Sequence, residues 1–159
     1  MEETKILNVL KDKFPGEVKE VLTSLGDEVV VIDKRALLPI VAFLRERPGE
    51  FSLLLDLSCV DYLGDNPRFE MVYHLFSLTR NRRLRIKARL AEDDLRIASL
   101  CGLWKNANWL EREVFDMFGV QFEGHPDLRR IFMYDCFEGY PLRKDYPLRK
   151  RQPCIKFRE

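Results

Sequence analysis

The chain has 159 residues, of which 46% are hydrophobic, and its formal net charge at pH 7 is +1. This length predicts a single domain, and the hydrophobic share excludes an intrinsically disordered protein. A net charge this small argues against a protein that is attracted as a whole to nucleic acid or anionic lipid. The longest apolar stretch, residues 36–44, is far shorter than the roughly 20 residues that a membrane-spanning helix needs, so no span is expected.

Helical and strand patterns alternate through the first fifty residues. Apolar side chains at helical spacing predict a helix over residues 3–14, which the Pro-Gly pair that follows would end. Residues 18–25 are expected to hold a short element, and the β-branched run at residues 28–32 predicts a strand. Asp33 is placed to cap a helix over residues 35–47, which a second Pro-Gly pair would stop.

Three strands and two helices are predicted next. The strands cover residues 51–60, 68–78 and 82–90, and the last two form a hairpin because only a short turn separates them. The helices cover residues 92–100 and 108–118. The order α-β-α-β-β-β-α-α predicts an α+β fold, a two-layer sandwich of a mixed or antiparallel sheet with helices on one face.

One predicted strand has a cationic face. Arg83, Arg85, Lys87 and Arg89 alternate with apolar residues, which indicates one solvated side and one core side. Such a row could contact RNA. We favour a solvated sheet face with charges that protect it from pairing, because no stacking aromatics accompany the row.

The four cysteines, Cys59, Cys101, Cys136 and Cys154, are far apart and form no C-x-x-C pair. The acidic start of the chain has no signal-peptide character, so reduced cytosolic thiols are expected. Iron–sulfur clusters need four nearby thiolates, and isolated cysteines do not supply them. The sequence thus predicts no cluster in this chain.

The helix over residues 108–118 carries three acids, Glu111, Glu113 and Asp116. Three carboxylates on one short helix could form a metal site or an acid–base pair. No histidine follows any of them at helical spacing, so structural ion pairing is the favoured interpretation. Asp116 is expected to pair with Arg112, four residues earlier on the same face.

Glu111 falls inside an apolar arc of that helix. A carboxylate in such a place must lie at an interface or meet a buried cation. The nearest candidate cations after the helix are Arg129 and Arg130. We therefore hypothesise that one of these arginines folds back onto Glu111 or Glu113.

Regular periodicity ends after residue 122. Residues 123–159, called the arm below, carry many large apolar side chains separated by prolines, with nine basic and six acidic residues. A segment without helix or sheet pattern does not recover its ordering entropy by itself, and Tyr, Phe, Met and Arg are typical of interface cores. We predict a globular domain over residues 1–122 and an extended arm that docks on a partner. Residues 123–135 could instead pack on their own domain, whereas residues 136–159 are assigned to the partner.

Two histidines, His74 and His125, occur in the chain. They are too few to suggest a histidine metal cluster. We expect His125, which precedes a Pro-Asp pair, to form loop hydrogen bonds, and His74 to be an ordinary sheet residue.

Four blocks in the second half of the chain stand in a fixed order. They are ANWLERE at residues 107–113, DMFG at 116–119, GHPDLRRI at 124–131 and GYPLRKDYPL at 139–148. Together they closely resemble the thirty-kilodalton subunit family of respiratory complex I, the NADH-quinone oxidoreductase. The family motif then comprises Glu111, Arg112, Glu113, Asp116, Gly119, His125, Pro126, Asp127, Arg129 and Arg130. Partner binding by the arm is assigned to Tyr140, Pro141, Leu142, Arg143, Lys144, Asp145 and Tyr146.

The resemblance implies a structural and assembly subunit in the hydrophilic arm of a proton-pumping complex. It implies no catalytic residue, cofactor or metal in this chain, because FMN, iron–sulfur clusters, NADH and quinone are handled by other subunits. The implied partners are the quinone-site subunit related to hydrogenase large subunits, which carries the letter D, and the iron–sulfur subunits B and I, and no nucleic acid. The implied place is the cytoplasmic face of the bacterial inner membrane, with membrane contact only through the complex.

Leu110 departs from the family, which often has tyrosine there, and the lack of a fused quinone-site region suggests the stand-alone form. Alternatives are the equivalent subunit of a ferredoxin- or deazaflavin-dependent quinone oxidoreductase or of an energy-converting membrane hydrogenase. A small RNA-binding protein that uses the basic strand and the arm is a further alternative. A hydrolase lacks a visible nucleophile–base pair.

Overall fold

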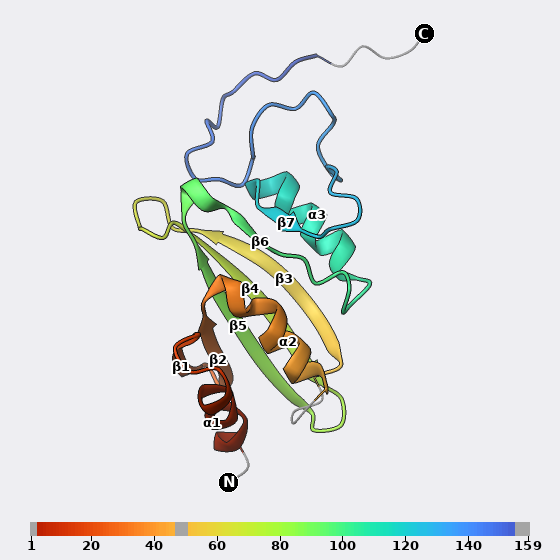
Figure 1. Cartoon of the computed structure of the whole chain (residues 1–159). Helices are drawn as coiled ribbons and strands as arrows, with labels where there is room; N and C mark the ends of the chain where they lie inside the picture. Colours follow the sequence, from red (N-terminus) through yellow and green to blue (C-terminus); the bar gives the residue numbers. More distant parts are fainter. Residues whose placement is uncertain (1–2, 47–50, 155–159) are drawn as a thin grey trace.

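The computed structural model of the chain describes residues 3–46 and 51–154. Figure 1 shows the elements and their order in space. Along the chain they are α1 (Glu3–Lys13), β1 (Val18–Ser24), β2 (Asp27–Ile32), the 3-10 turn η1 (Lys34–Ala36), α2 (Leu37–Glu46), β3 (Leu53–Asp61), β4 (Phe69–Ser77), β5 (Arg82–Leu90), the 3-10 turn η2 (Glu92–Asp94), β6 (Arg96–Ala98), α3 (Ala107–Phe118) and β7 (Gln121–Glu123).

The main sheet has five strands in the order β1-β2-β5-β4-β3. β1 and β2 form an antiparallel hairpin whose turn holds Leu25 and Gly26 at positive φ angles of 54° and 87°. Two such residues suit the twist of a tight hairpin. β2 pairs parallel with β5, whereas β5, β4 and β3 pair antiparallel. The sheet is therefore mixed, and the predicted α+β class is confirmed.

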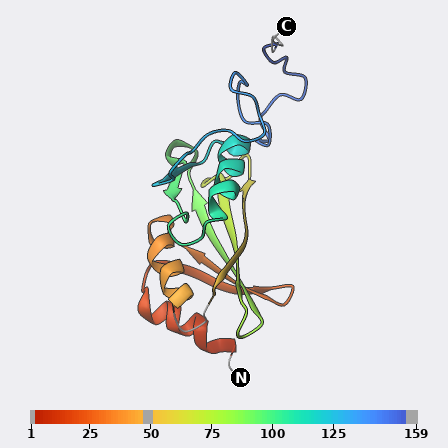
Figure 2. The same ribbon diagram turned by 90° about the vertical axis from the view of Figure 1, so that its right-hand side faces the viewer.

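One face of the sheet carries the core. α1 and α2 lie over this face in Figure 1, and the side view in Figure 2 places both helices on the same side of the strands. Leu10 of α1, Leu44 of α2 and Val114 of α3 join Tyr73 and Ile86 of the sheet in one hydrophobic cluster. The prediction of helices on one face is therefore also confirmed.

The opposite face of β5 carries the cationic row. Arg85 lies 3.1 Å from the carboxylate of Asp27, and Lys87 and Arg89 each lie 2.8 Å from Glu70. Opposite charges on neighbouring strands stabilise a sheet face. The arrangement agrees with the solvated, ion-paired face that the sequence favoured.

The helix predicted over residues 92–100 is wrong. This segment forms η2 and then the short strand β6, which pairs in parallel with β7. Leu95 and Ile97 are both buried, so the apolar residues here follow the period of a strand. The pairing partner lies more than twenty residues later in the chain, where no local pattern reveals it.

The helix boundaries follow capping rules. Asp33 accepts a hydrogen bond from the Arg35 amide at 3.0 Å, as a cap before η1 and α2. The stop expected at residues 48–49 lies outside the described residues. α3 ends at Gly119, whose φ is 81° and whose amide donates to the Phe115 carbonyl at 2.8 Å.

Two side chains just before α3 fix its start against β3, an edge strand. The Trp104 indole donates to the Ser52 carbonyl and the Asn106 amide to the Leu54 carbonyl, each at 2.8 Å. These bonds satisfy edge carbonyls that another strand could otherwise pair with. They place α3 beside β3 at the end of the molecule opposite α1 (Figure 1).

Candidate functional site

The carboxylate of Glu111 is buried beneath α3. It accepts hydrogen bonds from the Ser99 hydroxyl and the Leu100 amide, both at 2.6 Å, and from the Cys101 thiol at 3.5 Å. Burial raises the pKa of Glu111, and the bonds from Ser99 and Leu100 oppose that rise. Glu111 therefore ties the loop after β6 to α3.

Asp116, one turn further along α3, is also buried and receives four donors. The Arg130 guanidinium lies 2.8 Å from one oxygen, and the amides of Ile131, Phe132 and Met133 donate to the other at 3.1, 2.8 and 2.8 Å. Burial alone raises its pKa, but these hydrogen bonds together outweigh burial and leave the pKa below its usual value. Asp116 thus fixes the start of the arm to the helix.

The predicted ion-pair partners on this helix are wrong, although an arginine does fold back. Arg130 meets Asp116, and among the described residues no ion pair joins it to Glu111 or Glu113. Glu113 is exposed. The expected pair between Arg112 and Asp116 is absent as well, because both side chains bond to the arm.

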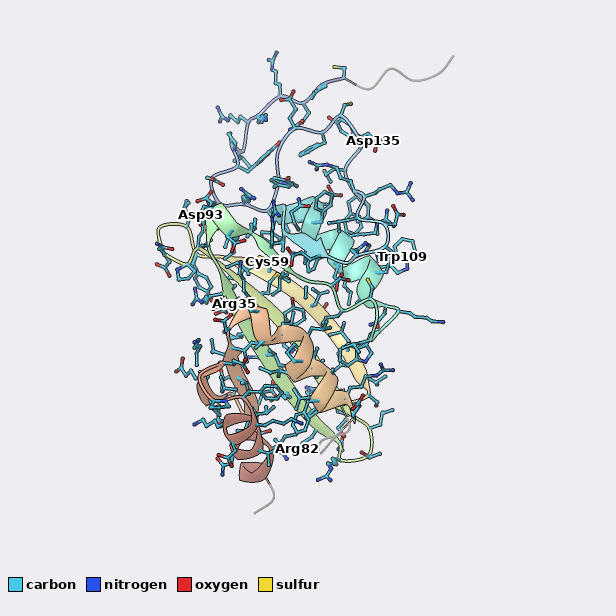
Figure 3. The ribbon with its side chains drawn as sticks, in the orientation of Figure 1. Arg35, Cys59, Arg82, Asp93, Trp109 and Asp135 are labelled. Atoms are coloured by element: carbon cyan, nitrogen blue, oxygen red, sulfur yellow. The ribbon has the colours of Figure 1, made fainter. Side chains whose placement is uncertain are left out.

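Arg112 holds the arm through its backbone. Its guanidinium donates to the carbonyls of Arg129 and Arg130, both at 3.0 Å. The same guanidinium lies 5.2 Å from the ring centroid of Trp109, which Figure 3 shows on the outer side of α3. Planar guanidinium groups suit such combined bonding and stacking.

The segment between β7 and Arg130 is closed by local bonds. His125 accepts from the Asp127 amide at 3.0 Å through Nδ1, and its Nε2 lies 3.1 Å from the Asn108 carbonyl. This is the loop role expected of His125. Pro126 separates these residues, and Asp127 pairs with Arg129 at 2.7 Å, which lowers the pKa of Asp127.

Cys101, Glu111 and His125 could together hold a metal ion, since one donor atom from each lies within 4.8 Å of the others. Sulfur, oxygen and nitrogen donors of these kinds suit zinc. Sequence reasoning missed Cys101 because the three residues are separated along the chain. In this structure both nitrogens of His125 and both oxygens of Glu111 have hydrogen-bond partners, so the trio fastens the loop, the helix and the arm together.

The arm crosses the end of α3 at Gly119. A Cβ added at this glycine would lie 2.5 Å from the ring of Tyr140, so the ring occupies the space that a side chain would need. Arg143 lies over the same ring at 4.6 Å and donates to the Phe118 carbonyl at 2.7 Å. The Leu142 amide also donates to the last turn of α3. Gly119 is therefore required for both its φ angle and its contact.

A buried arginine fixes the next part of the arm. Arg68 binds both oxygens of Asp61 at 2.8 Å and both oxygens of Asp145 at 2.8 and 3.1 Å. It also meets Glu92 at 2.8 Å, and the Lys144 amide donates to Asp61 at 2.8 Å. The pKa values of Asp61 and Asp145 are lowered mainly by Arg68. Sequence reasoning missed Arg68, because no local pattern links it to a carboxylate far along the chain.

These contacts correct the assignment of the last block to a partner. Tyr140, Arg143, the Lys144 backbone and Asp145 contact this chain's own body, and Tyr146 stacks on Phe137 with ring centroids 6.0 Å apart. Pro141 is half-buried, whereas the side chain of Leu142 is exposed. We call residues 139–146 the docked segment.

Comparison with known proteins agrees with the sequence blocks. The family described as "Respiratory-chain NADH dehydrogenase, 30 Kd subunit" matches residues 30–152. The chain belongs to this family. The match includes α3 and most of the arm, so the docked segment lies in the part that the thirty-kilodalton family shares.

Individual relatives of the thirty-kilodalton family give the same result. The chain is 45% identical over 137 residues to the NADH-quinone oxidoreductase C-subunit of Geotalea uraniireducens, covering 86% of this chain and 83% of that one. It is 49% identical over 138 residues to the C-subunit of Trichlorobacter lovleyi, covering 86% and 85%. It is also 41% identical over 153 residues to the C/D-subunit of a Psychrobacter species, covering 92% of this chain and 26% of that longer one.

Two solved structures share the fold. The trypsin-resistant fragment of Nqo5 is 32% identical, with a TM-score of 0.70 over 80% of this chain and 100% of that chain. A chain from the membrane-bound sulfane sulfur reductase, an archaeal respiratory membrane complex, is 24% identical, with a TM-score of 0.79 over 93% and 87%. The second likeness concerns the fold alone.

Proposed function

We propose that this chain is a structural, non-catalytic subunit in the hydrophilic arm of a proton-translocating NADH:quinone oxidoreductase. One observation carries the proposal: the motif side chains of a family member hold an extended arm in place. Asp116, Arg112 and Arg130 bond the start of the arm to α3, and Asp145 bonds the docked segment to the body. Their position in the fold is that of supports for a binding surface.

We propose that the redox chemistry of the complex lies outside this chain. NADH, FMN, iron–sulfur clusters and quinone would be bound by other subunits. The hydrogen bonds of Glu111 and Asp116 support this proposal, because both carboxylates already accept bonds from protein donors that fix their orientation. A carboxylate so occupied is suited to structure more than to proton transfer.

The proposed neighbours are the quinone-site subunit, which carries the letter D, and the iron–sulfur subunits B and I. The Psychrobacter relative supports a neighbour of the first kind, since its name joins the letters C and D in one chain. Its matching region and a further region share a polypeptide, which would keep the two together. The arm of the present chain would serve that contact between separate polypeptides.

We propose a peripheral position at the cytoplasmic face of the bacterial inner membrane. The helices within residues 3–46 and 51–154 include no segment long and apolar enough to cross a bilayer. Contact with the membrane would then come through the other subunits. The relatives named as NADH-quinone oxidoreductase subunits support this position.

The test is purification of the intact assembly from the source cells through a tag on this chain. We expect iron–sulfur and flavin-containing subunits to co-purify, with quinone reduction driven by NADH. Reduction driven by ferredoxin and not by NADH would assign the chain to a related complex. Recovery of the tagged chain by itself, with all activity in the unbound fraction, would contradict the proposal.

A further inference from the structure

The outer part of the arm, residues 147–154, bonds to another stretch of the arm. The Gln152 side chain accepts from the Glu138 amide at 2.9 Å and donates to the Glu138 carbonyl at 3.1 Å. The Tyr134 hydroxyl donates to the Pro153 carbonyl at 3.1 Å. Two stretches of the arm therefore lie side by side, and they project from the end of the molecule in Figure 1.

Aromatic rings fill the space between these stretches. The Phe137 ring centroid lies 5.6 Å from that of Tyr134 and 6.0 Å from that of Tyr146. All three rings are half-buried. Together with the docked segment they give the arm a defined shape before any partner arrives, which lowers the ordering cost of binding.

The outward edge of this arm has charges without partners. Lys144, Arg149 and Arg151 are exposed, and within the described chain their side chains form no ion pair or hydrogen bond. Leu148 lies between them and is 98% exposed. On the sheet face, by contrast, Lys87 and its neighbours meet carboxylates.

We propose that this edge, formed by Lys144, Leu148, Arg149 and Arg151, binds an acidic protein surface that has an apolar recess for Leu148. The inference rests on the proposed function, and it adds the chemistry of the partner surface. Arginine is enriched at protein interfaces. Complementary charge speeds association and fixes the register of the two surfaces.

A protein partner fits this edge better than nucleic acid. Single-stranded nucleic acids bind basic grooves in which exposed aromatic rings stack on the bases. The nearby rings of the arm, Tyr134, Phe137 and Tyr146, pack on one another instead. An exposed leucine between cations adds apolar contact that a phosphate backbone does not use.

The test compares two charge-reversed full-length chains in cells that lack their own copy. One carries Arg149→Glu and Arg151→Glu. The matched control carries Arg80→Glu and Arg83→Glu, two exposed arginines near the β4–β5 turn whose side chains form no ion pair with the described residues. The complex is purified through a tag on another subunit, and the ratio of this chain to the tagged one is measured by mass spectrometry.

We expect the arm variant to be roughly tenfold depleted from the complex, and the control to match the wild type. The urea unfolding midpoints of both isolated variants should equal that of the wild type. Incorporation of the arm variant at the wild-type level overturns the inference and leaves the proposed function standing. Equal depletion of both variants, or an arm variant that loses only RNA retained by the wild type, also overturns it. Absence of the wild-type chain from the complex would instead remove the proposed function.

Discussion

At the residue scale, Glu111 and Asp116 show how neighbours decide the state of a buried acid. Both lie on α3 with no exposed surface. Glu111 receives only neutral donors and its pKa is raised, chiefly by burial. Asp116 receives three amides and the Arg130 cation, and its pKa is lowered despite burial. The cation and the converging amides stabilise the charged form, because each donor points at a fixed negative charge.

Acid should destabilise the attachment of the arm. The pKa values of Asp61, Asp116 and Asp145 all lie below the ordinary 3.8 in the folded chain. Such acids bind protons more weakly when folded, so their contribution to stability is complete above 3.8 and is lost as pH falls through the lower folded values. We expect the free energy of unfolding, measured with urea, to decline between about pH 5 and about pH 2. Glu111, with its raised pKa, contributes in the opposite direction.

The control for this pH dependence is Asp116→Asn. The variant should be less stable at neutral pH and should lose less stability on acidification than the wild type, because one titrating group is gone. Identical pH slopes for the two chains would show that Asp116 does not carry the effect.

Gly119 is the position where a single methyl group should release the arm. Its φ of 81° disfavours any other residue, and the Tyr140 ring fills the Cβ position. We expect Gly119→Ala to lower the free energy of unfolding by roughly 2 kcal/mol. Urea denaturation measures the loss. Gly102→Ala is the matched control, because that glycine has no positive φ and no atom within 4 Å of an added Cβ; similar losses in both variants would contradict the explanation.

At the scale of elements, the docked segment behaves as part of the body. It has no regular secondary structure, yet the buried Arg68 and the end of α3 bind both its side chains and its backbone. Breaking a buried ion pair leaves an uncompensated charge, which costs about 3–5 kcal/mol. The boundary between what is fixed and what projects therefore falls near residue 146, well inside the predicted arm.

Limited trypsin digestion should locate this boundary. We expect the first cuts after Arg149, Lys150 and Arg151, which lie in exposed chain, while Arg143 and Lys144 stay protected in the docked segment. Mass spectrometry of early fragments measures the order. In Asp145→Ala the protection at Lys144 should disappear. Early cutting at Lys144 in the wild type would show that the segment is not held.

The element that the sequence mispredicted belongs to the same region. Residues 92–98 form a 3-10 turn and a strand because β7 offers them a parallel partner. Parallel pairing depends on a residue distant in the chain, whereas helix propensity is read from neighbours. α3 was predicted correctly because its apolar spacing and its closing glycine are local features.

At the scale of the whole molecule, the chain combines a folded body with an arm that projects from one end (Figure 1). The body fixes where the arm starts and its direction. A surface held in this way loses little conformational entropy when a partner binds. The proposed role in assembly depends on this arrangement.

Two truncations should separate stability from assembly. Deleting residues 147–159 leaves the docked segment intact, so we expect the free energy of unfolding to change by no more than about 0.5 kcal/mol, while incorporation into the complex falls. Deleting residues 136–159 also removes Asp145 and Tyr140, and should cost roughly 3 kcal/mol as well. Urea denaturation and the subunit ratio in purified complex are the two measurements. Normal incorporation of the shorter deletion would contradict a partner-facing arm.

The sequence by itself determined the α+β class, most strands, the caps at Asp33 and Gly119, and the family, because periodicity, turn chemistry and ordered motif blocks are local properties of the chain. It also indicated that an arginine folds back onto α3. Only the tertiary structure decided that Arg130 meets Asp116, that Glu111 binds a loop, and that Arg68 holds Asp145. Those partners are chosen by which groups folding brings within about 3 Å of a buried charge, and distance in space is not written in the order of residues.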